Sequence, residues 1–490
     1  MNRRLPRILR PRLTLKYIFF SLCAIYISYC YLLGMPLLSS NLPDYTGPYS
    51  VGTVDVESPV DARLIHDVRF KDGKPAFELE TVLFSLYYPA ASSIKPPKER
   101  HLWVPKPITL TSEGYAKFAR INSAFITKIF TLGLWTLAGG TTIPAAVDAP
   151  LFDSPPSLQS TFVNEGKLEE GTNGFPVIVF SHGMASSRTQ YSAFCGELAS
   201  RGYVVAAIEH RDGSSPGSMI MDLDGSEKPR LHFGLEDLQH DPSFDILALK
   251  DAQISFRHAE ILETVRVLQT INAGDGAEIF EFNPRKEGSD FGRWRGRLCM
   301  NSITLAGHSY GATGVLKSLK GAPHKGLPVG GAIILDPGKS SGPLNTDIDV
   351  PCLIIHSNSW SSRYSIFEGR PHFDVVKERA EGVNKRGHAA WFMTSLGTSH
   401  PSVTDAPLIE PMLLSWTTGS TIPVREGVEV YVKVAEEFLQ YQRTGVKAGL
   451  LAQPVTHPVY KEHGSSKELD ARMPELYQKY WQIHVTPSEP

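Results

Sequence analysis

The sequence predicts a mixed α/β protein built on a doubly wound, mostly parallel β-sheet, and three observations support this prediction. First, short apolar runs recur between turn residues or polar stretches, which suits buried parallel strands. Second, helical patterns lie between several of these runs; one apolar face repeats through Ile254, Ile261, Val265 and Leu268. Third, the chain is 42% hydrophobic and 20% charged, as in globular proteins, which excludes wholesale disorder. Alternating strands and helices imply right-handed crossovers. The predicted strands are Val177–Phe180, Val204–Ile208, Ile303–Ala306, Ala332–Leu335, Leu353–Ile355 and Trp391–Met393.

Charge and cysteine content exclude several classes of protein. The 490 residues carry 49 Lys and Arg against 51 Asp and Glu, a formal net charge of −2. No chain-wide basic field exists, so nucleic acid is not an expected partner. The five cysteines form no CxxC and no Cys/His cluster, which argues against a zinc site and a disulfide framework. We therefore expect free, mostly buried thiols and no metal.

The N-terminal segment predicts a transmembrane signal anchor. Residues 1–16 carry six basic residues, and Tyr17–Leu38 contains no charge over 22 residues. As a helix this run is about 33 Å long, which is enough to cross a bilayer. The basic flank should remain cytosolic, so the chain after Asp44 is expected on the lumenal or extracellular side of a membrane. A cleaved signal peptide, which would make the protein secreted, is the alternative.

From Tyr45 onward the sequence predicts one domain with loop insertions, spanning residues 45–444. Stretches rich in Gly, Pro and charge at Asp153–Gly174, Asp212–Pro242 and Ala273–Arg297 are expected insertions. Residues 445–490 are polar and punctuated by proline. We expect a poorly ordered C-terminal extension with one short helix near Met473–Trp481.

The motif G-x-S-x-G occurs three times, at Gly213–Gly217, Gly307–Gly311 and Gly338–Gly342. A nucleophile elbow needs a strand before the serine, a helix after it, and a backbone N–H on the following residue. The first match has Pro216 after its serine, which lacks that N–H. The third match runs into a proline-containing stretch that starts no helix. Only the second follows a predicted strand and precedes a helical pattern, so Ser309 is the predicted nucleophile.

A serine nucleophile needs a histidine base, and the histidine needs an orienting acid. In the strand–helix folds that use this elbow, the acid and then the histidine follow the serine, each just after a strand. Asp336 ends a predicted strand, and His400 follows another through a short loop. Competing candidates remain open at this point: His356 as the base, and His372, His388 and Asp405 by their proximity in sequence. Glu209 and His210 also end a strand, but they precede the serine.

The oxyanion of the tetrahedral intermediate needs two backbone N–H donors. The residue after the serine, Tyr310, is one predicted donor. The other is Met184, because Val177–Phe180 runs into a Ser-His-Gly-Met sequence in which Gly183 lets the backbone approach the substrate. His182 is interpreted as a side chain that braces this loop.

With these residues assembled, the chain resembles the plasma-type (group VII) platelet-activating factor acetylhydrolases, a lipase-like branch of the α/β-hydrolases. The resemblance covers about Gly47 to Thr444. Its most specific part is a series of short strings between residues 179 and 212, which other hydrolases do not share. The matching segments are Gly47–Gly52, Leu86–Pro89, Leu102–Pro105, Val179–Gly183, Arg188–Thr189, Tyr191–Ser192, Leu198–Ser200 and Val205–Asp212.

The resemblance implies an α/β-hydrolase fold with Ser309, Asp336 and His400 as the triad and Met184 and Tyr310 as oxyanion donors. The chain departs from the family at Gly338, where an aromatic residue is usual, and at Ala312-Thr313, where the family continues with a second glycine. The three insertions have no counterpart that we can identify.

The expected activity is a calcium-independent serine esterase of the phospholipase A2 type. It would hydrolyse a short or oxidised sn-2 acyl ester of platelet-activating-factor-like phospholipids, as a 1-alkyl-2-acetylglycerophosphocholine esterase does, without metal or other cofactor. Two alternatives are a carboxylesterase or polyester-hydrolase-like enzyme acting on soluble esters, and a non-catalytic, membrane-tethered scaffold on a hydrolase fold. The sequence does not indicate an oligomeric state.

Residues Ala124–Leu137 are unusually apolar, with Lys128 as their only charge. A buried core helix is one interpretation. The family resemblance implies the other, a helix that docks on lipid, with Phe130 and Trp135 inserting into the headgroup region and the membrane surface as a partner.

Overall fold

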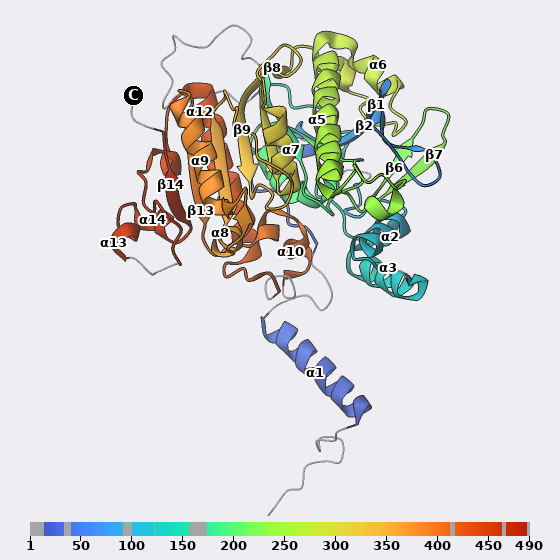
Figure 1. Cartoon of the computed structure of the whole chain (residues 1–490), viewed down its shortest axis with the longest axis horizontal. Helices are drawn as coiled ribbons and strands as arrows, with labels where there is room; N and C mark the ends of the chain where they lie inside the picture. Colours follow the sequence, from blue (N-terminus) through green and yellow to red (C-terminus); the bar gives the residue numbers. More distant parts are fainter. Residues whose placement is uncertain are drawn as a thin grey trace, which may run out of the picture.

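The computed structural model describes residues 14–33, 41–91, 100–121, 123–155, 174–411, 417–462 and 467–487. A ten-stranded sheet in the order β14-β13-β10-β9-β8-β4-β5-β2-β1-β3 runs through this part of the chain (Figure 1). The six strands from β13 to β5 in that order are parallel to one another. At the two ends of this group, β14 pairs antiparallel with β13 and β2 pairs antiparallel with β5. Strands β1 and β2 are also antiparallel to each other. The predicted mixed α/β class with a mostly parallel sheet is confirmed.

All six predicted strands coincide with observed ones. They are β4 (Phe175–Ser181), β5 (Val204–Glu209), β8 (Leu298–His308), β9 (Val329–Leu335), β10 (Cys352–Ser357) and β13 (Ala390–Ser395). Three further strands were not predicted from the sequence: β1 (Ser50–Arg69) and β2 (Pro75–Ala90), which form a long hairpin, and the short β3 (Ala146–Val147).

Helices cover both faces of the sheet, as a doubly wound arrangement requires. One core cluster joins strand residues to α5 (Ile246–Thr270), α7 (Tyr310–Ser318) and α9 (His372–Lys385). A second cluster, on the other face, joins strand residues to α4 (Ser192–Ala199) and α12 (Val424–Thr444). Alternate residues of one strand divide between the clusters: Val179 of β4 lies in the first and Phe180 in the second.

Two of the expected insertions have defined structure. Within residues 212–242, β6 (Gly217–Met221) and β7 (Glu227–Leu231) form an antiparallel hairpin. Within residues 273–297 the chain forms α6 (Gly276–Glu281), and Asn283 and Glu287 then accept hydrogen bonds from the backbone of β1. Most of the remaining insertion, residues 156–173, lies outside the described residues.

The C-terminal region corrects one expectation. Residues near the end form β14 (Trp481–Val485), which pairs with β13 and is buried along its whole length. The expected poorly ordered extension is therefore wrong for this segment, because Trp481, Ile483 and Val485 complete the core at the sheet edge. Two short helices precede this strand, α13 (Lys467–Asp470) and α14 (Glu475–Gln478), and the second falls within the predicted range.

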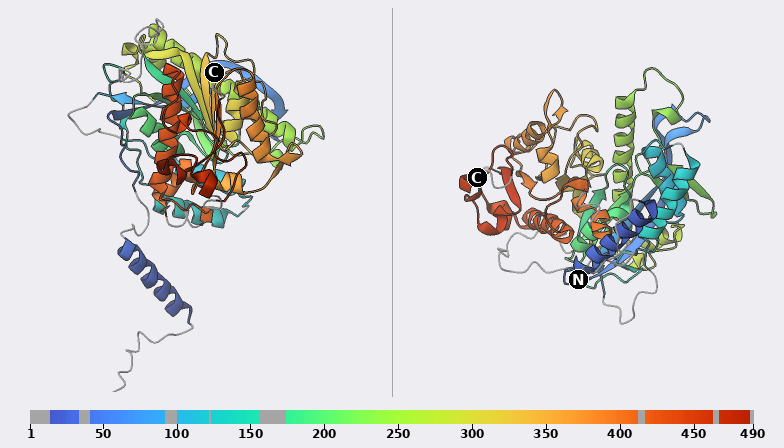
Figure 2. Two further views of the ribbon diagram at one scale, coloured as in Figure 1. Left: turned by 90° about the vertical axis from the view of Figure 1, so that its left-hand side faces the viewer. Right: turned by 90° about the horizontal axis from the view of Figure 1, so that it is seen from below.

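An apolar helix, α1 (Leu15–Leu33), lies apart from the body of the protein (Figures 1 and 2). Its window Leu15–Leu32 has a mean hydropathy of 1.5, and among the described helices it alone is long and apolar enough to cross a membrane. Only 6% of that window is buried, so α1 is not a core helix of the body. Residues 34–38 of the predicted segment lie outside the described residues. All five cysteines are free; Cys30, Cys195 and Cys352 are buried and the other two are half-buried.

The remaining helices and strands are short or lie at the periphery. They are α2 (Ile108–Phe118), α3 (Ala124–Ala138), α8 (Asn358–Ser362), β11 (Ile366–Phe367), β12 (Arg370–Pro371) and α10 (Ala406–Ile409).

Candidate active site

Ser309 lies on the sharp turn between β8 and α7, with φ 57° and ψ −119°. A non-glycine residue in this backbone region is strained, and such strain is common at functional sites. The flanking glycines have no room for a side chain. A Cβ on Gly307 would lie 2.6 Å from the carbonyl oxygen of Gly311, and one on Gly311 would lie 2.1 Å from that of Ser181. The turn therefore has the strand–serine–helix form of a nucleophile elbow.

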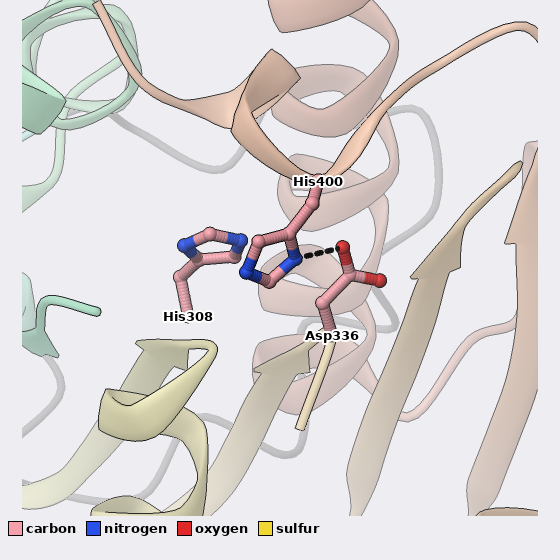
Figure 3. Close-up of side chains that lie close together, drawn as sticks. All are labelled: His308, Asp336 and His400. Carbon is pink, nitrogen blue, oxygen red and sulfur yellow. Dashed lines mark hydrogen bonds and ion pairs between the residues drawn. The ribbon is translucent and has the colours of Figure 1, made fainter. Parts of the chain in front are cut away.

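Ser309, His400 and Asp336 form one hydrogen-bonded row. The distance from Ser309 Oγ to His400 Nε2 is 3.0 Å, and that from His400 Nδ1 to Asp336 Oδ2 is 2.8 Å. Figure 3 shows the imidazole of His400 turned toward Asp336, which follows β9. In this geometry the histidine can accept the serine proton while the carboxylate fixes its tautomer and stabilises the imidazolium.

The carboxylate of Asp336 is itself held in place. Its Oδ1 accepts a hydrogen bond from the backbone N–H of Ser357 at 2.6 Å, and its Oδ2 accepts one from the Ser357 hydroxyl at 2.7 Å. Asp336 is buried, so these bonds compensate the loss of water around its charge. The acid is therefore fixed from the end of β10 as well as from its own strand.

The loop after β4 lies against the elbow. A Cβ on Gly183 would lie 3.2 Å from the Cβ of Ser309, so the loop passes directly beside the serine. The N–H of Met184 donates to no group in the described part of the chain. The N–H of Tyr310 belongs to the first turn of α7, where backbone donors lack helical partners. Both groups predicted to be oxyanion donors thus lie in segments that meet at Ser309.

A chain of hydrogen bonds joins this loop to the elbow. Gly183 N–H donates to Tyr191 Oη at 3.1 Å, and the Tyr191 hydroxyl lies 2.7 Å from His308 Nδ1. Burial and the neighbouring His400 hold the pKa of His308 well below its usual value, so His308 is neutral and its Nδ1 can accept a hydrogen bond from the tyrosine hydroxyl. Neither the role of Tyr191 nor that of His308 was predicted from the sequence. The residue types, a tyrosine and a histidine, were the only sequence feature that pointed to hydrogen bonding at these two positions.

His182 braces the loop, as interpreted from the sequence. Its Nδ1 lies 2.7 Å from the carbonyl oxygen of Gly183, and its Nε2 accepts a hydrogen bond from the N–H of His210 at 3.2 Å. Burial, with the nearby Arg257 cation, lowers the pKa of His182 to about 3. A neutral, fully buried imidazole is suited to hold backbone rather than to exchange protons with substrate.

None of the competing candidates for the base is hydrogen-bonded to Ser309 in the described part of the chain, where the partner of Ser309 Oγ is His400. His356 is buried, bonded to Ser361 and stacked on His372. His210 is paired with Glu260 at 2.6 Å. His388 lies between α9 and β13, and no contact joins it to the elbow in the described residues.

The competing acids likewise hold structure together. Glu209 forms an ion pair with Arg188 at 2.9 Å. Asp405 accepts hydrogen bonds from the indole of Trp103 and from the backbone of Ser192. Neither contacts the imidazole of His400 in the described part of the structure.

The serines of the two other G-x-S-x-G matches lie elsewhere. Ser215 donates its hydroxyl to the carbonyl oxygen of His210 at 2.7 Å, and its 3.4 Å approach to the buried His182 is longer. Ser340 accepts a hydrogen bond from Lys250 through its backbone carbonyl and has no histidine partner in the described residues. Of the three serines, Ser309 is thus the one that is hydrogen-bonded to a histidine which in turn contacts an aspartate in the described residues.

His308, Asp336 and His400 also bring three potential ligand atoms within 4.8 Å of one another, the one such group among the described residues (Figure 3). Two imidazoles and a carboxylate are a donor set that a divalent cation accepts. However, Asp336 Oδ2 and His400 Nδ1 are already joined to each other, and His308 Nδ1 is joined to Tyr191. A serine–histidine–aspartate row that transfers a proton accounts for the bonds of Asp336 and His400. We therefore interpret these two residues as part of a triad with Ser309, and His308 as its neutral neighbour.

The fold and the site together define the class: a mixed α/β protein with the Ser-His-Asp arrangement of serine hydrolases. A family profile described as "Platelet-activating factor acetylhydrolase, isoform II" matches residues 37–448, most of the chain. The chain therefore belongs to this family, as its sequence resemblance indicated.

Individual relatives agree with this assignment. The chain is 29% identical over 279 residues to a "Putative phospholipase A2" of Schizosaccharomyces pombe, covering 55% of this chain and 57% of that protein. It is 24% identical over 288 residues to the platelet-activating factor acetylhydrolase of Cavia porcellus, covering 57% and 52%. The alignments thus span just over half the length of these relatives. A ferulic acid esterase from Streptomyces cinnamoneus has a similar fold, with a TM-score of 0.51 and 18% identity over 85% of this chain and 96% of that one.

Proposed function

We propose that this protein is a serine esterase of the phospholipase A2 type, acting on the short or oxidised sn-2 acyl ester of platelet-activating-factor-like phospholipids. One observation carries the proposal: Ser309, His400 and Asp336 form a continuous row, at 3.0 Å and 2.8 Å, in a member of this family. The names of its relatives, a putative phospholipase A2 and several acetylhydrolases, support a phospholipid substrate.

In the proposed mechanism, Ser309 Oγ attacks the ester carbonyl while its proton passes to His400 Nε2. The N–H groups of Met184 and Tyr310 stabilise the oxyanion of the tetrahedral intermediate. His400 then returns the proton to the leaving lysophospholipid oxygen, which leaves an acyl group on Ser309. Water, deprotonated by His400, releases the acyl group as a carboxylic acid. Asp336 keeps its charge throughout and holds the imidazole.

The test is a panel of phosphatidylcholines that differ only in sn-2 acyl length, assayed with purified protein alongside soluble p-nitrophenyl esters. The proposal expects turnover of acetyl and short oxidised chains and a steep loss with long chains. Turnover of the soluble esters alone would favour a carboxylesterase. Absence of both turnover and fluorophosphonate labelling would favour a non-catalytic scaffold.

The proposal includes a lipid-facing surface on α3. Ser123 caps this helix by accepting a hydrogen bond from the N–H of Ile126. The only buried residue of α3 is Ala138, whereas the side chains of Trp135 and Phe130 are 62% and 40% exposed. The interpretation of this segment as a core helix is therefore wrong. An exposed row of large apolar side chains suits insertion among lipid headgroups. The other large, exposed apolar residues of α3 are Phe125, Ile126, Ile129, Leu132 and Leu137.

We further propose that α1 anchors the protein, with the catalytic domain on the lumenal or extracellular side. Figure 1 shows α2 and α3 at the lower edge of the body, on the side where α1 lies. An anchored protein resists alkaline carbonate extraction, and its catalytic domain is protected from protease in sealed microsomes. Release into the soluble fraction would indicate cleavage of the segment and secretion.

A further inference from the structure

We propose that Trp360 is a positioning residue that favours the imidazolium form of His400 and so promotes the proton transfer; this inference rests on the proposed esterase function. The indole of Trp360 is stacked on the imidazole of His400, with ring centroids 4.0 Å apart and planes inclined by 10°. An aromatic face attracts a cation through its quadrupole. His400 gains a positive charge as it takes the serine proton, so the stack is stronger in the transition state than before it.

Trp360 belongs to α8, a five-residue helix that contacts both the acid and the base. Ser357, its N-cap, donates two hydrogen bonds to Asp336. The hydroxyl oxygen of Ser359 accepts a hydrogen bond from the backbone N–H of His400 at 2.9 Å. The helix therefore fixes the carboxylate, the histidine backbone and the histidine ring through three nearby residues, and Trp360 supplies the contact with the ring.

The indole is itself locked in orientation. Its Nε1–H donates to the carbonyl oxygen of Pro337 at 3.0 Å, directly after Asp336. The neighbouring Gly338 cannot supply the aromatic ring instead. A Cβ there would lie 2.2 Å from Ser341 Oγ and 3.1 Å from Thr313 Oγ1. The ring against His400 therefore comes from α8.

Other charged and titratable groups around His400 also act on the stability of its imidazolium form. Among the described residues Asp336 is the one carboxylate in contact with it, and the neutral His308 lies against it with ring centroids 4.5 Å apart. A cation, the ammonium of Lys339, also lies nearby. Lys339 Nζ is 4.6 Å from the Trp360 ring centroid and donates to the carbonyl oxygens of Trp360 and Arg363. Burial lowers the pKa of Lys339 to about 8, so its ammonium is charged through most of the neutral range and opposes a second positive charge at His400.

The experiment compares Trp360→Leu and Trp360→Phe in the full-length protein in detergent micelles, with p-nitrophenyl acetate as substrate. Trp360→Leu is expected to lower kcat about tenfold with KM within about twofold, since a cation–π contact of this kind accounts for roughly that factor. The acid limb of its kcat/KM–pH profile should move to lower pH, because the imidazolium of the free enzyme loses the same support. Trp360→Phe keeps an aromatic face and should restore most of kcat and the original limb.

Controls separate this outcome from misfolding and from failure of the proposed function. Tyr364→Leu removes an exposed aromatic side chain just after the same helix and should leave all parameters unchanged. Thermal unfolding shows whether each variant folds; if Trp360→Leu does not, Trp360→Phe against Trp360→Met provides the same comparison. Unchanged kcat and an unchanged acid limb in the folded, non-aromatic variant would overturn the inference. A wild-type protein that neither turns over ester nor reacts with a fluorophosphonate would instead overturn the esterase function.

Discussion

The triad and helix α3 are built on opposite principles. Around Ser309 the polar groups are joined by hydrogen bonds, from the buried Ser357 and Asp336 to the half-buried His400. On α3 the large apolar side chains face outward, and Trp135 is 62% exposed. Bond breaking needs atoms held in fixed positions, whereas binding an interface needs apolar surface that the protein leaves uncovered. We therefore expect that substitutions can alter ester hydrolysis and lipid binding separately.

The strongest test of this separation removes the nucleophile. Ser309→Ala should lower kcat by about 10⁶-fold, because loss of a triad serine removes covalent catalysis as a whole. Ser215→Ala and Ser340→Ala, in the two other motif matches, should retain most of the activity. Steady-state hydrolysis of p-nitrophenyl acetate measures all three. Liposome binding of Ser309→Ala should be unchanged, and a loss of binding would show that the two regions are not independent.

Asp336→Asn should have the next largest effect, about 10⁴-fold on kcat, because an amide favours the wrong tautomer of the histidine. The amide oxygen can still accept the hydrogen bond from the Ser357 N–H, and the Ser357 hydroxyl can turn to accept one from the amide NH2. The fold should therefore persist, and circular dichroism together with the thermal midpoint checks this. Asp405→Asn alters an acid that serves structure; it should change stability more than kcat. A similar loss of kcat in both variants would contradict the assignment of the acid.

The double change Phe130→Ser and Trp135→Ser tests the other side of the comparison. In a protein that begins at residue 45, and so lacks α1, liposome binding should weaken roughly 10- to 100-fold, because two large apolar side chains no longer leave water. Hydrolysis of a soluble short-chain ester should be spared. Liposome flotation and ester kinetics are the two measurements. Binding equal to that of the parent protein would remove α3 from the interface.

Chelation should have the smallest effect. EDTA is expected to leave ester turnover unchanged, because a serine–histidine pair generates its own nucleophile without a bound ion. The assay uses a short-chain phospholipid with and without added calcium. A calcium requirement would point to a metal-assisted phospholipase mechanism, and His308 with Asp336 and His400 would then be the first residues to examine.

Much of the sheet was predictable because its parallel strands are buried on both faces and so appear as unbroken apolar runs. The hairpin of β1 and β2 was not, since β1 carries acids that are buried in ion pairs. Asp55 pairs with Arg188 at 2.5 Å, and Glu57 pairs with Arg211 at 2.7 Å. Their partners are more than a hundred residues away in the chain. Such residues look like surface positions until the fold brings the opposite charges together.

In the candidate site, too, the residues that could not be predicted are those whose partners are distant in sequence. Ser309 could be selected because strand, turn and helix are local signals, and Asp336 and His400 follow strands that were recognisable. The residues that hold the site in place were missed. Trp360 contacts His400, which lies 40 positions further along the chain, and Tyr191 contacts His308, which lies more than a hundred positions further along. Nothing in the local pattern of either aromatic residue distinguishes it from an ordinary core or surface residue.

The central claim is that Ser309 is an acyl-accepting nucleophile, and the most direct measurement is peptide mapping of the labelled protein by mass spectrometry. After reaction with a fluorophosphonate, or after rapid acid quench during turnover of a 2-acetyl phospholipid, the adduct should lie on Ser309 alone. Prior incubation with the acetyl substrate should slow labelling. An adduct on Ser215, Ser340 or any other residue, or a protein that turns over ester without a modified Ser309, would contradict the account.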